Sequence, residues 1–420
     1  MIMIHVYNFI LLLIYPIYKI LELFYLSRFD FFQIRRKEIR KIKDFTQLIS
    51  GKVIWLHAAS VGELDQCKSM IHVIKKESPG VFILQTVFSD SVQNKNLEVD
   101  FIDFYCRLPL DFAGNYDLIF KKFHPNLLII TAWDLWPNLV HTAIKRDVKV
   151  FFASATLHQG SGRIRNPIIR KLTSEVLNKV TGISPSNSKL IPIFSSLTQN
   201  QKIESAGDSR FDSVIQKIEN RNTDFSTGLQ KKKNSPVLIL ASTYNQCDTF
   251  IFPDLKKLIE SGFQIWIFPH KVDEERIREI QMNLKKHDLT YSIFSENQNP
   301  DSSILVIDKI GILAYSYELA DLTYVGGGFH NRIHNVIEPA YFGLPIATGP
   351  KISHAAEAID LHNEGYLSIL ENPGDLIQFC SIIQDQKLYS ETKEKIKLYV
   401  QKNKGASQRF YDQFLRKELK

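Results

Sequence analysis

Short, continuously apolar segments alternate with helical segments from residue 51 onward, and this alternation limits the folds available to the chain. Continuously apolar strands are typical of a parallel sheet that is covered by helices on both faces. The expected strands are Val53–Leu56, Val81–Thr86, Leu127–Thr131 and Val148–Ala153, then Val237–Ala241, Gln264–Phe268, Ile304–Asp308, Thr323–Val325 and Pro345–Ala347. The expected helical segments include Leu64–Lys76, Trp136–Arg146, Asp254–Ser261 and Val272–Lys285. The fold class predicted from this pattern is α/β, with doubly wound sheets.

A polar run over residues 216–235 interrupts the alternation once and is typical of a linker. A chain of 420 residues has room for two or three domains of about 150 residues each. We therefore expect one domain over residues 28–215 and a second over residues 236–385. The last segment, residues 386–420, is expected to be a charged amphipathic helix that includes Leu388–Leu415.

The amino-terminal segment, residues 1–27, is strongly apolar and predicts a membrane anchor. It lacks the basic start and the small-residue cleavage site of a secretory signal peptide. Tyrosines suited to a membrane interface punctuate it, and a basic cluster from Arg28 to Lys43 follows. The positive-inside rule then places the rest of the chain in the cytoplasm, beside anionic headgroups. A helix that spans the membrane, one that lies in the interface, and a core helix all remain possible at this point.

Charge and cysteine content exclude several classes of protein. Lysines and arginines outnumber acidic residues by 52 to 45, a net charge of +7. This excess is too mild for a dedicated nucleic-acid binder but suits anionic small molecules or an anionic membrane surface. The four cysteines are far apart and form no Cys-x-x-Cys pair, which disfavours a disulfide scaffold or a structural zinc cluster and fits a reducing compartment.

The segment Val325–Pro350 is the most informative candidate site. A strand ending in three glycines leads into a helix expected to begin near His334, and a helix start of this kind suits phosphate. His334 and Glu338 are four residues apart and are expected to share one helix face, so that Glu338 could bind ribose hydroxyls. Asn335 could cap the helix or contact phosphate. A tight glycine turn and a zinc site are the alternatives, but no third zinc ligand lies nearby, so we favour a nucleotide.

A second candidate site follows the strand Val53–Leu56. Ser60 and Glu63 match the helix capping box, whereas His57 lies at the carboxyl end of the strand, where open α/β sheets bind ligands. Weaker candidates at other strand ends are Ser242, Thr243 and His270. Arg210, in Gly207–Asp212, could pair with an anion. Each of these taken alone is more typical of a helix cap or of an exposed polar residue.

These segments together resemble the 3-deoxy-D-manno-octulosonic acid (Kdo) transferase family. The matching motifs, in the family's order, are Ile54–Glu63, Leu108–Asp111, Trp136–Asn138, Gly207–Asp212, Ala241–Thr243, Val325–Ala340 and Gly349-Pro350. The resemblance implies a GT-B fold, in which two Rossmann-like domains face each other across a cleft, with an amino-terminal membrane anchor. It also implies a glycosyltransferase that moves Kdo from CMP-Kdo to the lipid A precursor (lipid IVA) in lipopolysaccharide synthesis, inverting, without a metal or other cofactor. The expected location is the cytoplasmic face of the inner membrane.

The resemblance also implies roles for particular residues. Glu38 is the nearest equivalent of the family's general base, although the usual Gly-Glu-Arg context is missing. The residues expected to bind acceptor and sugar are His57, Ser60, Gly62 and Glu63. Those expected to bind the nucleotide are Arg210, Ser242, Thr243, His270, Gly327, Gly328, His334, Asn335 and Glu338.

Three segments depart from the family pattern and keep other functions open. The family's Glu-x-Glu reads Ala132-Trp133-Asp134, its Ser-Thr-His-Glu reads Ser242-Thr243-Tyr244-Asn245, and its Pro-Arg-His reads Pro269-His270-Lys271. The alternatives are another lipid-linked glycosyltransferase, a sugar-nucleotide epimerase, or a non-catalytic membrane-bound glycolipid or nucleotide binder. An epimerase has no need of an anchor, and a Rossmann dehydrogenase is disfavoured because no Gly-x-Gly-x-x-Gly follows the first strand.

Overall fold

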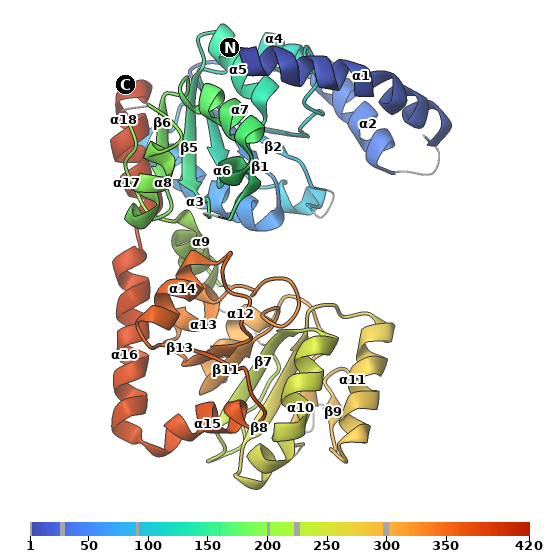
Figure 1. Ribbon diagram of the computed structural model, residues 1–420, viewed down its shortest axis with the longest axis vertical. Coiled ribbons are helices and arrows are strands. Elements are labelled where there is room, and N and C mark those ends of the chain that lie inside the picture. Colours follow the sequence, from blue (N-terminus) through green and yellow to red (C-terminus); the bar gives the residue numbers. More distant parts are fainter. Residues whose placement is uncertain are drawn as a thin grey trace. The chain divides into compact units, whose positions relative to one another are not determined.

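The computed structural model describes residues 2–25, 30–89, 92–158, 160–199, 202–221, 227–296 and 302–420. The chain forms two compact units, each of which is described by itself. Unit 1 comprises Met1–Ser213 together with Lys404–Lys420, and unit 2 comprises Val214–Asn403 (Figure 1).

Unit 1 is built on a six-stranded parallel sheet with the order β3-β2-β1-β4-β5-β6. The strands are β1 (Val53–Ala58), β2 (Phe82–Val87), β3 (Phe104–Arg107), β4 (Leu127–Thr131), β5 (Lys149–Ala155) and β6 (Gly182–Pro185). The four strands expected from the sequence are β1, β2, β4 and β5. The edge strands β3 and β6 were not expected, because each has four residues and β6 contains both a glycine and a proline.

Alternate residues of a strand point to opposite faces of the sheet, and in this sheet the residues on both faces are apolar. Helices therefore cover both faces. Val53 and Trp55 belong to one buried core, while Ile54 and Leu56 belong to the core on the other face. The first eight helices, all in unit 1, are α1 (Ile2–Tyr25), α2 (Asp30–Asp44), α3 (Val61–Glu77), α4 (Asp117–Phe123), α5 (Pro137–Lys145), α6 (Gly162–Arg165), α7 (Pro167–Leu177) and α8 (Ile191–Ser195). The expected doubly wound architecture is confirmed for unit 1.

Unit 2 has a seven-stranded parallel sheet with the order β13-β12-β11-β7-β8-β10-β9. Its strands are β7 (Val237–Thr243), β8 (Gln264–Pro269), β9 (Ser292–Ile293), β10 (Ile304–Val306), β11 (Leu322–Val325), β12 (Ile346–Thr348) and β13 (Leu367–Ile369). Its helices are α10 (Asn245–Glu260), α11 (Glu274–Lys286), α12 (Leu313–Ser316), α13 (Ile337–Tyr341), α14 (Ala356–Asn363), α15 (Asp375–Cys380) and α16 (Gln386–Asn403). All five expected strands are present, and two short edge strands, β9 and β13, are added.

The connections between the units differ from the expected boundaries. The first residues of the expected linker, 216–219, form the end of α9 (Ser209–Glu219), and residues 222–226 lie outside the described residues. The expected carboxyl-terminal helix is interrupted after α16, where Gly405 has a φ of +85°. The chain then continues as α17 (Ala406–Phe410), a π-helical turn over Tyr411–Leu415, and α18 (Arg416–Leu419).

Residues after the interruption complete the core of unit 1. Four of them pack against the face of the unit 1 sheet that contains Phe151 and are buried there: Phe410, Tyr411, Phe414 and Leu415. The break is fixed by Asp212, whose carboxylate accepts the backbone N–H groups of Gly405 and Ser407, each at 2.6 Å. Asp212 thus satisfies two N–H groups at the start of α17 that the helix itself leaves unpaired.

Candidate functional site

Each sheet has a central switch point, where the strand order runs outward in both directions, and open α/β sheets bind ligands at the carboxyl ends of the strands there. In unit 1 this point lies between β1 and β4, and in unit 2 it lies between β7 and β11. His57 lies at the carboxyl end of β1, and the short connection after it leads to Glu63 in the first turn of α3. The loop after β11 carries the three glycines and His334. Both candidate sites found in the sequence therefore fall at a switch point.

In unit 1, the fully buried His57 joins two neighbouring strands to the loop after β4. Its Nδ1 lies 2.9 Å from the hydroxyl of Thr86, which accepts a 2.8 Å hydrogen bond from Trp55 Nε1. Its Nε2 lies 2.8 Å from Oδ2 of Asp134, and that oxygen also accepts from Trp136 Nε1 at 2.7 Å. Because an ionised carboxylate can only accept, Nε2 of His57 donates to Asp134.

Two carboxylates beside this histidine differ in their affinity for protons. Burial alone would raise the pKa of Asp134, but hydrogen bonds from His57 and Trp136, with the attraction of His57, hold that pKa below its usual value. The pKa of Glu63 is raised, mainly by burial and also by the charge of Asp134. Unit 1 therefore presents an ionised carboxylate and a more basic one at the same switch point, an arrangement typical of functional sites.

The segment His57–Glu63 contains the start of α3, where one half of the expected capping box is formed and the other is not. Ser60 is the residue before α3, but its side chain makes no capping hydrogen bond. The carboxylate of Glu63 does fold back, accepting the backbone N–H of Ala59 and that of Ser60. A Cβ on Gly62 would meet nothing within 4 Å, so the start of α3 is open to an approaching ligand.

Glu38 lies on α2 beside the edge strand β3. Its carboxylate accepts a hydrogen bond from the backbone N–H of Arg107, while its Oε2 is buried and has no hydrogen-bond partner among the described residues. Burial raises the pKa of Glu38 above its usual value, although the charges of Lys41, Arg107 and Arg35 act in the opposite direction. A buried carboxylate oxygen with a raised pKa and no partner is suited to accept a proton from a bound hydroxyl.

Glu38 of α2 and His57 of β1 both lie near the carboxyl ends of the strands in unit 1. Arg107 pairs with Val87 of β2, and Val87 pairs with Ala58 of β1, the residue after His57. The backbone of Arg107, which donates to Glu38, is therefore two strand spacings, about 10 Å, from the β1 backbone next to His57.

Arg210 also belongs to unit 1, whereas the other residues expected to bind the nucleotide belong to unit 2. Its Nε and Nη2 donate to Oδ2 of Asp208, at 2.9 and 2.6 Å, and its backbone N–H donates to the other oxygen of that carboxylate at 2.9 Å. Asp208 therefore holds the guanidinium in one orientation.

In unit 2, four aromatic rings gather at the carboxyl ends of β7, β8 and β11. The ring of Tyr244 lies 4.6 Å from that of His270 and 4.6 Å from that of His330, and both pairs are stacked. His334 joins the group, with Nε2 3.1 Å from the Tyr244 hydroxyl and its ring 4.5 Å from that of His270. Tyr244 and His330 had no predicted role, although both lie within motifs that the sequence singled out.

The neighbours of His334 keep it neutral. Burial, then the charges of His270, Arg332 and His330, lower the pKa of His334 to about 4. A neutral imidazole at this position can both donate and accept a hydrogen bond. The pKa of His270 beside it is also lowered, by partial burial first and then by the charges of Lys271 and His330.

The three glycines after β11 make room for the chain's own backbone. A Cβ on Gly326 would lie 2.2 Å from the carbonyl oxygen of Ser242, and one on Gly328 would lie 2.6 Å from backbone atoms of Gly349. Gly327 has a φ of +93°, in the left-handed region, and a Cβ there would lie 2.1 Å from the carbonyl oxygen of Arg332. The glycines therefore let this loop lie close to the backbone of Ser242 and of Gly349, and close to its own residue Arg332.

The helix after the glycines begins later than the sequence suggested and is only five residues long. It is α13, starting at Ile337, because Asn335 Oδ1 accepts the N–H of Ile337 at 2.9 Å and so ends the preceding loop. His334 therefore lies before the helix, and its ring contacts Tyr244, while Glu338 is paired with Lys217 at 2.8 Å. The expected common face of His334 and Glu338 is not formed.

Ser242 and Thr243 have different environments. Ser242 is half-buried with a φ of +51°. Thr243 is fully buried, and its hydroxyl accepts a 3.2 Å hydrogen bond from Arg276, which also pairs with the buried Asp248 at 2.6 Å. The side chain of Thr243 thus belongs to the interior rather than to the ligand side of the loop.

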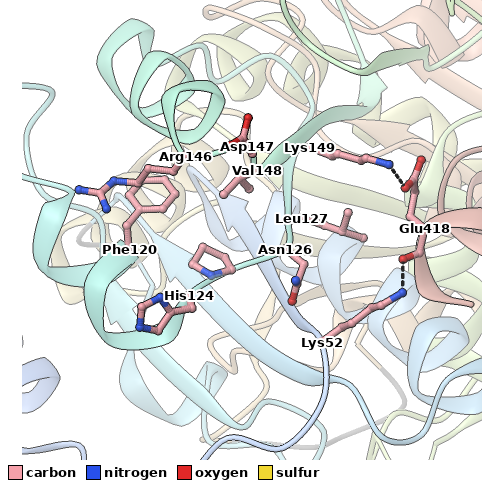
Figure 2. Close-up of a pocket in the computed structure, with 11 residues that line it drawn as sticks. Lys52, Phe120, His124, Asn126, Leu127, Arg146, Asp147, Val148, Lys149 and Glu418 are labelled. Carbon is pink, nitrogen blue, oxygen red and sulfur yellow. Dashed lines mark hydrogen bonds and ion pairs between the residues drawn. The ribbon is translucent and has the colours of Figure 1, made fainter.

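Unit 1 also has a cavity of about 520 Å³, which lies away from the carboxyl ends of the strands where His57 is found (Figure 2). It is formed around Asn126, Leu127 and Val148, at the amino ends of β4 and β5, with Lys52 just before β1. Lys52 donates to the carbonyl oxygen of Glu418 at 2.7 Å. Since ligands bind at the carboxyl ends of such strands, this cavity is not the candidate site. Within the described ranges, no group of three or more potential metal ligands comes together.

Comparison with known proteins places the sequence motifs in context. Residues 27–213 match the sequence profile of the 3-deoxy-D-manno-octulosonic-acid transferase (kdotransferase) family. A 3-deoxy-D-manno-octulosonic acid transferase of Rickettsia felis is 27% identical over 331 residues, which cover 77% of this chain and 70% of the relative. The transferase of the same name from Haemophilus influenzae is 25% identical over 376 residues, or 86% of each chain.

A similar fold occurs in a solved structure, the UDP-GlcNAc 2-epimerase of Neisseria meningitidis bound to UDP-GlcNAc. The TM-score is 0.63 at 14% sequence identity, covering 87% of this chain and all of the epimerase chain. At that identity the likeness concerns the fold alone.

Proposed function

Residues 27–213 match the Kdo transferase family, and Kdo transferases of two bacteria resemble most of the chain. With two Rossmann-like units beside this match, we propose that the chain is a GT-B glycosyltransferase of this family that transfers Kdo from CMP-Kdo to lipid IVA. Its proposed place is the cytoplasmic face of the inner membrane, attached through α1. The observation that carries the proposal is that the family motifs around His57 and His334 occupy the switch points of the two sheets.

The proposed reaction proceeds with inversion and without a metal. An acceptor hydroxyl attacks the anomeric carbon of Kdo from the face opposite CMP while the bond from that carbon to the phosphate oxygen breaks. Glu38 accepts the proton of the attacking hydroxyl, and CMP leaves with the electron pair. In support, Glu38 Oε2 is buried without a hydrogen-bond partner among the described residues, and burial raises the pKa of this carboxyl above its usual value.

The remaining residues are assigned to binding. His57, Ser60, Gly62 and Glu63 are proposed to face acceptor and sugar, because they surround the open start of α3. The proposed nucleotide residues of unit 2 are Ser242, His270, Gly327, Gly328, His334, Asn335 and Glu338, joined by Thr243 through its backbone. Arg210 is proposed to meet the donor phosphate, since Asp208 holds its guanidinium in one orientation.

The proposal is tested by product mass. The purified full-length protein is incubated with CMP-Kdo and tetra-acylated lipid A precursor, and the lipid is weighed by mass spectrometry. A mass gain of one or more Kdo units is expected, and the number of units is read directly. In a parallel reaction UDP-GlcNAc replaces CMP-Kdo. Mass gain only with the second donor, or with neither, would refute the assignment and favour another lipid-linked transferase or a binding protein.

A further inference from the structure

The first helix, α1, has two faces of opposite character. Positions spaced by three and four residues, which lie on one side of a helix, turn toward unit 1. Ile4 is 2% exposed and lies in a groove with Pro137 and Val140 of α5 and Val176 of α7. In Figure 1, α1 (dark blue) runs along unit 1, with α5 near its amino end.

Hydrogen bonds fix the same side of α1 to two sequence motifs that had no role so far. The Tyr7 hydroxyl donates to Oδ2 of Asp111 at 2.9 Å, and Nδ2 of Asn138 donates to Oδ1 of Asn8 at 2.7 Å. Asp111 is itself buried and ends the motif Leu108–Asp111, while Asn138 ends Trp136–Asn138. These motif residues therefore serve as the docking point of α1.

The contact continues along the helix. The rings of Tyr15 and Tyr18 lie 5.1 and 5.4 Å from that of Phe112. From Ile4 to Tyr18 the attached length is 14 residues, about 21 Å at 1.5 Å per residue. This is about two thirds of the roughly 30 Å of hydrocarbon in a bilayer.

The opposite side of α1 is apolar and uncovered. Between Ile2 and Tyr18 the helix carries no acidic or basic residue apart from His5. Leu12 is 65% exposed, and by length and composition Ile2–Leu21 could cross a membrane. Apart from Tyr15, whose ring contacts Phe112, the other exposed large apolar side chains of α1 are Ile2, Val6, Phe9, Ile10, Leu13, Ile14, Ile17, Ile20 and Leu21.

We infer that α1 lies in the plane of the membrane surface, with its uncovered face in the lipid and its other face on unit 1, and does not span the bilayer. A spanning orientation would either break the Tyr7 and Asn8 hydrogen bonds or draw the polar surface around Asp111 into hydrocarbon. Buried polar groups make either change unfavourable. An amphipathic helix in the interface satisfies both faces at once.

Charge supports a lipid surface as the occupant of this face rather than a second copy of the chain. The helix that follows, α2, has exposed Lys37, Arg40 and Lys43 and an exposed Ile39. Cationic groups beside an exposed apolar helix match anionic headgroups above hydrocarbon.

The docking point is close to the candidate site of unit 1 along the chain. Asn138, which holds α1, lies two residues after Trp136, whose indole donates to Asp134. A bilayer that contacts α1 is thus next to the loop in which Asp134 meets His57, where a glycolipid acceptor would enter. The inference deepens the proposed membrane attachment and does not depend on the transfer reaction.

Depth measurement in vesicles tests this orientation. Cysteines replace Val6, Leu13 and Ile20 one at a time in the full-length protein, at three exposed positions on one side of α1, and carry a fluorophore. The four native cysteines are buried, so background labelling is low. The vesicles contain phosphatidylethanolamine, phosphatidylglycerol and nitroxide lipids that quench at shallow or deep positions, and no nucleotide or acceptor is added.

For a helix in the plane, all three labels are quenched equally, and more strongly by the shallow nitroxide. A label at Leu11, on the docked side, is quenched several-fold less, and it gains quenching when Tyr7→Phe and Asn8→Ala loosen the contact. If Leu13 instead responds to the deep nitroxide while Val6 and Ile20 respond to the shallow one, the helix spans and the inference is wrong. It is also wrong if no label is quenched, or if the same cysteine variants, left unlabelled, form disulfide-linked dimers through this face.

These outcomes are separable from those for the proposed function, because the quenching needs no substrate. In-plane quenching without Kdo transfer would refute the transferase proposal alone. Transfer by a protein with a spanning α1 would refute the orientation alone.

Discussion

The Nε2 of His57 lies 2.8 Å from Oδ2 of Asp134, although 77 residues separate the two along the chain. The pair joins the carboxyl end of β1 to the loop after β4, across the switch point of the unit 1 sheet. Aspartate stands here where the resemblance to the Kdo transferases implies a glutamate, and His57 is fully buried. The carboxylate is therefore the acceptor that fixes the orientation of this imidazole.

Loss of that acceptor should destabilise the protein. In Asp134→Ala, the N–H groups of His57 and Trp136 lose their partner, and leaving a buried donor unpaired costs about 1–3 kcal/mol. We expect the free energy of unfolding, measured in urea, to fall by about that amount. The control is Asp117→Ala, which removes an exposed ion pair with Arg146 and should cost at most about 1 kcal/mol. If both variants lost the same free energy of unfolding, the buried His57–Asp134 pair would contribute no more than an exposed ion pair.

Glu38→Gln should abolish proton transfer while leaving the fold intact. If Glu38 is the general base, kcat falls by about 10²- to 10⁴-fold, while CMP binding and thermal unfolding stay unchanged. The matched control is Glu98→Gln, which alters a carboxylate that accepts from Tyr105 beside the same strand and should keep wild-type turnover. Wild-type turnover in Glu38→Gln would remove Glu38 from this role.

The pH profile gives an independent reading of the same group. Burial raises the pKa of Glu38 above its ordinary value of 4.5, and a base acts only when deprotonated. The rate should therefore fall as the pH drops through an apparent pKa higher than 4.5. The residual activity of Glu38→Gln should lack this acidic limb, and its persistence would assign the titration to another residue.

Gly326→Ala should disrupt the loop of unit 2 because its Cβ would lie 2.2 Å from the carbonyl oxygen of Ser242. Forcing backbone apart in a packed interior costs about 1–3 kcal/mol, which thermal unfolding would register. The control in the same unit is Gly365→Asn, because Gly365 has open space around it and asparagine tolerates its positive φ. An unchanged midpoint in Gly326→Ala would contradict the tight packing of this loop.

His334 should contribute a pH-dependent term to stability. Its pKa falls from 6.5 to about 4 on folding, mainly through burial, so the folded protein binds fewer protons between these values. The contribution is present above pH 6.5 and is lost as the pH falls toward 4, by at most about 3 kcal/mol. In His334→Gln the decline over this range should be shallower, whereas in the exposed His354→Gln it should match wild type. Identical slopes for wild type and His334→Gln would contradict the linkage.

The central strands could be predicted from the sequence because their residues are apolar on both faces, as in Val53–Ala58 and Val237–Thr243. The placement of His57 and of the glycine loop at strand ends followed from the same pattern. The edge strands were missed, since Gly182–Pro185 and Ser292–Ile293 contain too few apolar residues to stand out.

Side-chain partners distant in sequence were the part that could not be predicted. Spacing placed His334 and Glu338 on one helix face, but Asn335 delays the helix to Ile337, and the two side chains bind Tyr244 and Lys217 instead. The stacking of Tyr244 between imidazoles depends on three strands meeting, which no local periodicity records.

The return of residues 404–420 to unit 1 has a consequence for biosynthesis. The ribosome makes β1–β6 first, yet Phe410 and Phe414, which complete that core, emerge only after the whole of unit 2. The core of unit 1 therefore stays incomplete while unit 2 is translated. Nascent chains stalled before residue 404 should accordingly be digested by protease within unit 1, and chains extended past residue 420 should resist.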